Sequence, residues 1–157
     1  MNVIEYCTEE VQRQGHDTTV LDGIERVGWM LDAWSYAIAL SSPRPGYLGQ
    51  RPILSDVESL GRRAEPKKNK DGFRSVRVRV GPRICPEPDQ VPRLLKLLFE
   101  QRDVLSPFEW YKEFELIHPF VDGNGRTGKI LLAWLDDRLL NPDFPPKDLF
   151  GDWIENP

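Results

Sequence analysis

The run from His118 to Lys129, HPFVDGNGRTGK, constrains this chain more than any other stretch. It places an imidazole, a carboxylate, three glycines, an amide and two cations between two segments with helical apolar spacing. The pattern predicts a helix end, a tight loop and a new helix start. A helix start presents free backbone N–H groups and the positive end of a dipole. The run therefore predicts an anion site at the mouth of a helix.

Individual side chains of this run suit phosphate chemistry. His118 is the residue type best suited to act as a base near neutral pH. Asp122 can hold a hard cation such as Mg²⁺, which would bridge phosphate oxygens. Arg126 and Lys129 are three residues apart, so they share one face of the following helix. Together these residues predict a phosphate site beside a general base.

The same run contains a competing pattern. Residues 123–128 also read as G-x-G-x-x-G, and the preceding FELI could form a strand. A dinucleotide-binding fold would then need a second strand and an acidic residue about 20 positions further on. LLAWLDDRLL and a Pro-rich segment follow instead. We therefore favour two helices joined by a loop.

Composition and apolar spacing predict one mainly α-helical domain over 1–157. The 39% hydrophobic content, with five Trp, is typical of a globular chain. Its core is expected at about 20–140, after a polar N-terminal segment (1–17) and before a Pro-rich tail (141–157). Ser106, Pro107 and Glu109 form the clearest helix start. Apolar residues recur at helical spacing over about 20–40, 55–63, 89–101, 107–117 and 124–140.

A basic hairpin is predicted before the run. Residues 73–80, FRSVRVRV, alternate apolar and basic side chains, which is typical of a strand, and 83–86 can return after a Gly-Pro turn. Residues 62–83 hold nine Lys/Arg and two acids. Two interpretations stay open. The charge could protect a solvated edge strand from aggregation, or the edge could dock an acidic or extended partner.

The remaining composition bears on location and partners. Two cysteines far apart, Cys7 and Cys85, argue against a disulfide framework and fit a reducing cytoplasm. The N-terminus lacks the basic start and apolar run of a secretory signal, and no stretch reaches membrane-spanning length. The net charge of −4 argues against specific nucleic-acid binding. We therefore expect a cytoplasmic protein without a membrane partner.

The motif also carries a family resemblance. HPFVDGNGRTGK resembles the Fic (Fic/Doc) family signature H-P-F-x-D/E-G-N-G-R-x-x-R at every position except the last, where Lys129 replaces an arginine. The resemblance implies a Fic-type helical domain with a β-hairpin flap that aligns protein targets by strand addition. The flap would be the hairpin at 72–85, and its target-docking residues would be Arg74, Val76, Arg77, Val78 and Arg79.

An activity follows from this resemblance as an expectation. It implies Mg²⁺-dependent transfer of AMP, or a related nucleotide or phosphate moiety, from ATP to a Ser, Thr or Tyr hydroxyl of a target protein. His118 would be the general base, Asp122 would hold the metal, and Phe120 would anchor the loop in the core. The nucleotide and phosphate ligands would be Gly123, Asn124, Gly125, Arg126 and Lys129.

Two departures from the family pattern qualify this expectation. Lysine lacks the planar fork of arginine, so Lys129 leaves the identity of the donor nucleotide open. Many family members also carry an inhibitory helix, S/T-x-x-x-E-G/N, whose Glu pairs with that second arginine. Residues 18–23 resemble it with Asp22 in place of Glu, and a weaker match ends at Glu155. Capping of the next helix by Thr19 and Asp22 explains the first match equally well.

A different class of function remains as the alternative. The chain could be a weakly active or inactive binding protein of the same fold that grips a partner through the basic hairpin at 72–85. The intact His118, Asp122, Asn124 and Arg126 favour the enzyme. The sequence names neither the target protein nor an antitoxin or other inhibitory partner.

Overall fold

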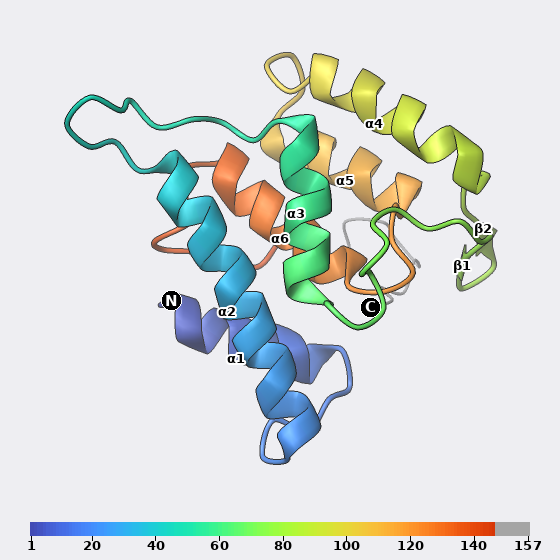
Figure 1. The fold of residues 1–157 in the computed structure, drawn as a ribbon, viewed down its shortest axis with the longest axis horizontal. Coiled ribbons are helices and arrows are strands. Elements are labelled where there is room, and N and C mark those ends of the chain that lie inside the picture. Colours follow the sequence, from blue (N-terminus) through green and yellow to red (C-terminus); the bar gives the residue numbers. More distant parts are fainter. Residues whose placement is uncertain (147–157) are drawn as a thin grey trace.

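A computed structural model describes residues 1–146 of the chain. This part holds six α-helices and one small antiparallel hairpin (Figure 1), which confirms the predicted mainly α-helical fold. No helix within it is long and apolar enough to cross a membrane. The elements are α1 (Val3–Arg13), α2 (Leu21–Ser41), α3 (Leu54–Ala64), β1 (Arg79–Val80), β2 (Arg83–Ile84), a 3-10 turn (Pro88–Gln90), α4 (Val91–Glu100), α5 (Pro107–Ile117) and α6 (Asn124–Leu135).

Helix α6 is the central helix of the fold. Helices α2, α3 and α5 pack against it (Figure 1), and all of its residues, from Asn124 to Leu135, are buried. Its apolar side chains join the main core, as their spacing predicted. A helix covered on every side also buries its polar side chains, and buried charges need partners. The polar residues of the motif are therefore enclosed by neighbouring elements.

The starts of α5 and α2 show one correct and one wrong capping prediction. The Ser106 hydroxyl accepts the Glu109 N–H at 3.2 Å, and the Glu109 carboxylate accepts the Ser106 N–H at 3.1 Å. Helix α2 instead begins after Val20, which makes no side-chain cap. The Thr19 N–H and hydroxyl both donate to Asp17, at 2.9 and 2.6 Å. Thr19 is therefore part of the preceding turn.

Helix α6 is shorter than predicted. Its apolar spacing suggested a helix to about residue 140, but it ends at Leu135. Asp137 adopts a left-handed conformation with φ 56°, and the Arg138 N–H closes the helix end on the Ala133 carbonyl at 2.8 Å. The chain then turns, and Leu139 packs into the core from the loop. Of the predicted tail at 141–157, residues 147–157, including Glu155, lie outside the described residues.

The hairpin is present, but it is much shorter than the predicted strand at 73–80. Only Arg79 and Val80 pair with β2, with Arg79 opposite Ile84 and Val80 opposite Arg83. The Arg74 N–H donates to the Pro119 carbonyl at 2.9 Å. The backbone of Arg74 therefore contacts the motif loop, and residues 73–77 are not part of a paired strand despite their alternating pattern.

A close contact between α3 and the motif leads to a first prediction. Gly61 lies against the fully buried ring of Phe120, and an added Cβ would sit 2.1 Å from Phe120 Cζ. We expect Gly61→Ala to lower the free energy of unfolding by about 1–3 kcal/mol, because overpacking outweighs the ~1 kcal/mol that alanine gains in helix propensity. Urea denaturation measures the change.

The matched control is Gly28→Ala on α2. Gly28 is exposed, and no atom lies within 4 Å of an added Cβ there. Gly28→Ala should raise the free energy of unfolding by up to about 1 kcal/mol. Equal shifts for the two variants would show that Phe120 yields readily and does not fix the loop.

Candidate functional site

The motif occupies the connection between α5 and α6. His118 ends α5 in the left-handed region, with φ 52° and ψ 66°, which is uncommon for a residue other than glycine and clusters at functional sites. Gly123 precedes α6 with φ 75°. The first hydrogen bond closing α6 runs from the Thr127 N–H to the Gly123 carbonyl at 3.0 Å. The N–H groups of residues 124–126 therefore point from the helix start, as predicted.

The His118 imidazole is enclosed. The residue is 4% exposed. Burial, together with the charges of Arg83 and Arg74, lowers the pKa of His118 from 6.5 to about 4, against the opposing effects of a backbone hydrogen bond at Glu115 and of the Asp122 charge. Desolvation of this size disfavours the imidazolium. The ring is therefore neutral at pH 7 and able to accept a proton.

Two arginines from the hairpin segment hold the end of α5. Arg83 donates from Nη1 to the Leu116 carbonyl at 2.9 Å. Arg74 is only 3% exposed, and its guanidinium donates to the carbonyls of His118, Ile117, Pro86 and Val76 at 2.7 to 3.2 Å. Cations suit the orphan carbonyls of residues 116–118, which lie at the C-terminus of α5. The Arg74 side chain is thus not free to dock a target, contrary to its predicted flap role.

Asp122 carries the predicted carboxylate of the site. Its Oδ2 accepts from Lys68 Nζ at 2.9 Å, its Oδ1 accepts the Gly123 N–H at 2.8 Å, and Arg126 Nη2 lies 3.6 Å away. Burial alone would raise the pKa of Asp122, but Lys68, Arg126 and the Gly123 N–H outweigh it and hold the pKa below its ordinary value. The carboxylate is therefore ionised, and 13% of its side chain remains exposed.

The Asn124 side chain is fully used by the loop. Its Oδ1 accepts the Phe120 N–H at 2.8 Å, and its Nδ2 donates to the Phe120 carbonyl at 2.9 Å. The residue is completely buried. The predicted anion-hole role for this amide is therefore corrected to a structural one, because both ends of the amide bind one residue and fix the turn. Only the backbone N–H of Asn124 remains at the helix mouth.

Arg126 contacts an acid that the sequence interpretation missed. Its Nη1 donates to the Ala64 carbonyl at 2.9 Å, and its Nη2 donates to Glu65 Oε2 at 3.4 Å. The same Glu65 oxygen accepts from Arg26 Nη1 at 2.6 Å. Glu65 is 1% exposed and Arg126 is fully buried. A buried acid thus links α2 to the motif.

Lys129 does not share a site with Arg126, contrary to the prediction. Its Nζ lies 2.8 Å from Glu10 Oε2, and both side chains are 1% exposed. Glu10 comes from α1, so the motif's second cation faces the N-terminal helix. The predicted inhibitory acid, Asp22, is largely exposed and contacts Arg26 at 3.2 Å and His16 at 3.6 Å. Asp22 therefore pairs with neither the motif nor Lys129.

The loop after α3 forms a second wall of the site. Glu65 contacts Arg126, Lys68 contacts Asp122, and Asn69 Nδ2 donates both to the Asp122 carbonyl at 2.8 Å and to the Gly61 carbonyl at 3.0 Å. Asn69 is 1% exposed. The composition of the loop after α3 predicted only a charged loop. Nothing in the local sequence marks these residues as neighbours of a motif more than 50 positions away.

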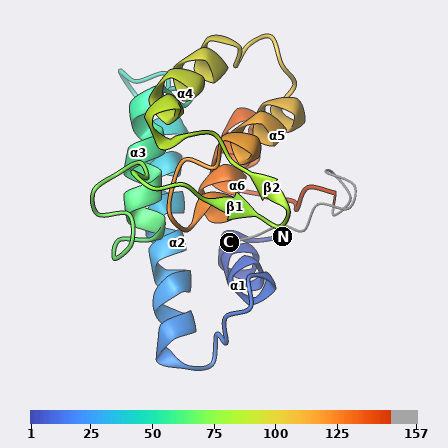
Figure 2. The ribbon, with the colours of Figure 1, turned by 90° about the vertical axis from the view of Figure 1, so that its right-hand side faces the viewer.

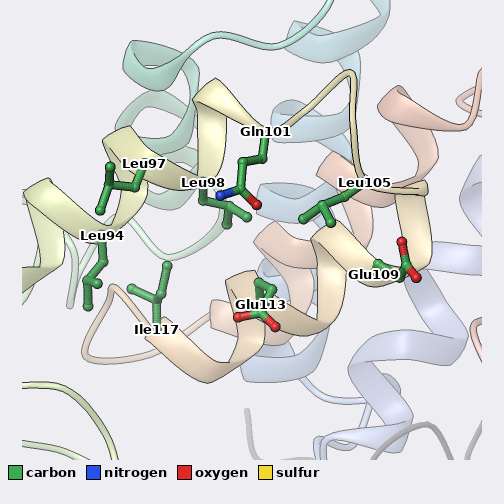
Figure 3. A pocket seen from close by; sticks show the side chains of 8 residues that line it. All are labelled: Leu94, Leu97, Leu98, Gln101, Leu105, Glu109, Glu113 and Ile117. Atoms are coloured by element: carbon green, nitrogen blue, oxygen red, sulfur yellow. The ribbon is translucent and has the colours of Figure 1, made fainter.

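A separate hollow lies between α4 and α5 (Figure 3). Its volume is about 390 Å³, and acidic side chains stand at its α5 rim. No residue of the motif lines it, although Ile117 directly precedes His118. The lining residues are Leu94, Leu97, Leu98, Gln101, Leu105, Glu109, Glu113 and Ile117.

The side chains around the motif suit a metal ion that is coordinated mainly by a bound phosphate compound and by water. No cluster of three or more His, Cys, Asp or Glu within residues 1–146 could hold a metal ion. Asp122 offers one hard carboxylate with a partly exposed side chain. Mg²⁺ is commonly bound by one or two carboxylates together with waters and substrate phosphates. The residues present therefore fit Mg²⁺ that arrives with a polyphosphate.

Comparisons with known proteins identify what the chain resembles. The model of the Fic/DOC family matches residues 53–135, more than half of the chain. The protein adenylyltransferase Fic of Nematostella vectensis is 31% identical over 83 residues, covering 47% of this chain and 19% of that protein. The corresponding protein of Drosophila grimshawi is 32% identical over 106 residues, covering 59% and 21%. A probable protein adenylyltransferase of Aquifex aeolicus is 27% identical over 153 residues, covering 90% and 47%.

The fold of this chain resembles a solved structure over most of this chain's length. The crystal structure of a Fic family protein from Desulfovibrio desulfuricans G20 has a TM-score of 0.64 and 18% sequence identity. The similarity covers 87% of this chain and 48% of that one, and it concerns the fold alone. The chain therefore spans about a fifth of the length of the animal relatives and about half of the bacterial ones.

Proposed function

Because this chain belongs to the Fic/DOC family, we propose that it transfers AMP from ATP to a Ser, Thr or Tyr hydroxyl of a protein. One observation carries the proposal. Within seven residues, His118 to Asn124, the α5–α6 connection joins a neutral imidazole, an ionised carboxylate and a helix N-terminus whose first N–H groups have no intrahelical partner. A base, a metal ligand and an anion site are the parts that phosphoryl and nucleotidyl transfer need.

His118 is the general base in this proposal. Its neutral ring accepts the proton of the target hydroxyl as the oxygen bonds to the α-phosphorus. The bond from the α-phosphorus to the bridging oxygen breaks, and pyrophosphate leaves. Because His118 is only 4% exposed, the hydroxyl reaches its ring only when the groups that cover it move aside.

Asp122 is the residue that would hold Mg²⁺. When bound, the metal would neutralise charge on the phosphate oxygens. The carboxylate is already ionised and has an exposed edge, so no protonation change is needed before it binds a cation. Lys68 contacts one of the carboxylate oxygens, and its ammonium would have to leave that contact for Asp122 to hold a cation there.

The phosphates would lie against the start of α6. The backbone N–H groups of Asn124, Gly125 and Arg126 precede the first intrahelical hydrogen bond, so they can donate to an anion. Gly123 adopts a positive φ that favours glycine at this turn. Arg126 Nε is buried without a hydrogen-bond partner in residues 1–146, so this donor of its fork can bind a phosphate oxygen once the groups that cover Arg126 move aside.

The hairpin would present the target hydroxyl. Val76 is 51% exposed, Arg77 and Arg79 are exposed, and Val78 is half-buried. Arg77 pairs with Glu87 on the surface at 3.0 Å. An extended target segment can pair with a strand edge through its main chain. We assign target docking to these four residues and exclude the Arg74 side chain.

We place this chemistry in the cytoplasm. Cys7 and Cys85 are both free and buried, which suits a reducing compartment. The partners of the reaction are a nucleotide and a hydroxyl-bearing protein.

The alternative is a binding protein of the same fold. Two observations favour it: His118 is enclosed, and Lys129 is engaged by Glu10. Such a protein would grip its partner through the hairpin at 72–85 without transferring anything. Labelling with ATP separates the enzyme from the binding protein.

Labelling with ATP tests the proposed function. The full chain is incubated with Mg²⁺, a lysate as the source of targets, and ATP labelled at either the α- or the γ-phosphate. AMP transfer places the α label, and not the γ label, on protein. Label from the γ position alone would indicate phosphate transfer, and no label from either would favour the binding protein.

A further inference from the structure

The motif supplies one cation to its loop where the family signature has two. Lys129 occupies the position of the second arginine, but it is buried against Glu10 from α1 at 2.8 Å. A triphosphate carries several negative charges, and Arg126 provides one positive charge at the loop. A second cation near Asp122 would therefore complement the ligand.

Lys68 lies where such a cation is needed. Its Nζ is 2.9 Å from Asp122 Oδ2, and half of its side chain, 52%, is exposed. The neighbouring residue Asn69 is buried and bonded to the Asp122 and Gly61 carbonyls, which fixes the backbone of this loop against the motif. The backbone at Lys68 is thus held in place by its neighbour, while the long Lys68 side chain can move.

We propose that Lys68 binds the terminal phosphates of the nucleoside triphosphate in the role that the sequence assigned to Lys129. The inference rests on the proposed function. Asp122 holds Lys68 at the site before the ligand arrives. The ammonium then turns to the phosphate oxygens, while Asp122 keeps its contacts with Arg126 and the Gly123 N–H. Lysine suits this change of partner because it is a point charge on a flexible stem.

If Lys68 contacts the terminal phosphates, its removal should affect nucleotides differently according to the number of phosphates they carry. ATP and ADP carry phosphates beyond the α position, and AMP does not. Removing a contact with the terminal phosphates should therefore weaken the binding of ATP and leave the binding of AMP nearly unchanged. Lys67 offers a matched control, because it carries the same charge on the same loop but lies 3.5 Å from Glu25, with 72% of its side chain exposed.

The experiment measures direct binding of ATP, ADP and AMP by calorimetry, with and without Mg²⁺, to the wild type, Lys68→Met, Lys68→Arg and Lys67→Met. We expect Lys68→Met to weaken ATP binding by about tenfold, the effect of one charge-assisted hydrogen bond. AMP affinity should change less than about twofold. Lys67→Met should resemble the wild type, and Lys68→Arg should keep most of the ATP affinity. Thermal melting checks that every variant is folded.

Any one of four results would overturn the inference. Equal losses in Lys68→Met and Lys67→Met would show only general attraction by a basic loop. Tighter ATP binding by Lys68→Met would show that Lys68 competes with the ligand for the site. Wild-type protein that binds no ATP would overturn the proposed function together with this inference, whereas normal ATP binding by Lys68→Met overturns the inference alone.

Discussion

Replacing His118 with alanine is expected to lower the rate of protein labelling from α-labelled ATP by about 10²–10⁴-fold, the usual contribution of a general base. ATP affinity should stay near the wild-type value, because the imidazole acts on the hydroxyl and not on the phosphates. The rate is measured at saturating ATP with a fixed amount of target, and affinity is measured separately by calorimetry.

His118→Ala also needs a structural control, because His118 ends α5 with a positive φ. His118→Asn keeps a small polar residue that tolerates this conformation while removing the imidazole. Both variants should label slowly, and His118→Asn should melt closer to the wild-type temperature than His118→Ala. A folded His118→Asn variant that labels at the wild-type rate would mean that another group takes the proton.

The pKa of His118 predicts how stability depends on pH. The folded-state pKa is lowered to about 4, whereas 6.5 is ordinary. Below pH 6.5 the unfolded chain binds a proton that the folded protein does not, so the free energy of unfolding falls by up to about 1.4 kcal/mol per pH unit until pH nears 4. Urea denaturation at pH 7, 5.5 and 4.5 should show a smaller loss for His118→Ala. Parallel losses would show that the ring is not held neutral.

Local patterns were enough to predict most helices of this fold. The capping box at Ser106 and Glu109 forms as expected, because both partners lie within one turn. The predicted end of α6 was wrong because Leu139 continues the apolar spacing after the helix has stopped and packs from a loop. The alternation at 73–80 misled for a similar reason: Arg74 turns inward to carbonyls of the motif.

The candidate site, too, was predicted only where neighbouring residues in the sequence determine it. The motif predicted which residues lie at the helix mouth, since the His118 to Asn124 stretch is contiguous. It could not predict which cations face the loop, because that depends on what surrounds α6. Lys129 meets Glu10 from α1, and Arg126 meets Glu65 from the end of α3. These pairs join residues 119 and 61 positions apart, and no periodic signal connects them.

Removing the acid at position 65 should have the largest effect on stability. Glu65 Oε2 accepts from Arg26 at 2.6 Å and from Arg126 at 3.4 Å, and the acid is 1% exposed. Glu65→Ala leaves the fully buried Arg126 without its closest acid, and breaking a buried pair in this way costs about 3–5 kcal/mol. We expect a loss of that size in urea denaturation, together with weaker ATP binding because the Arg126 fork is no longer held.

Two comparisons make this expectation specific to a buried pair. Glu25→Ala removes an acid whose contact with Lys67 is exposed, so it should cost less than about 1 kcal/mol. Glu65→Gln keeps the shape and one acceptor but removes the charge, and it should fall between the wild type and Glu65→Ala. If Glu65→Ala lowered the free energy of unfolding no more than Glu25→Ala does, the Ala64 carbonyl and Asp122 alone would hold Arg126. The chain from α2 through Glu65 to the motif would then have no energetic role.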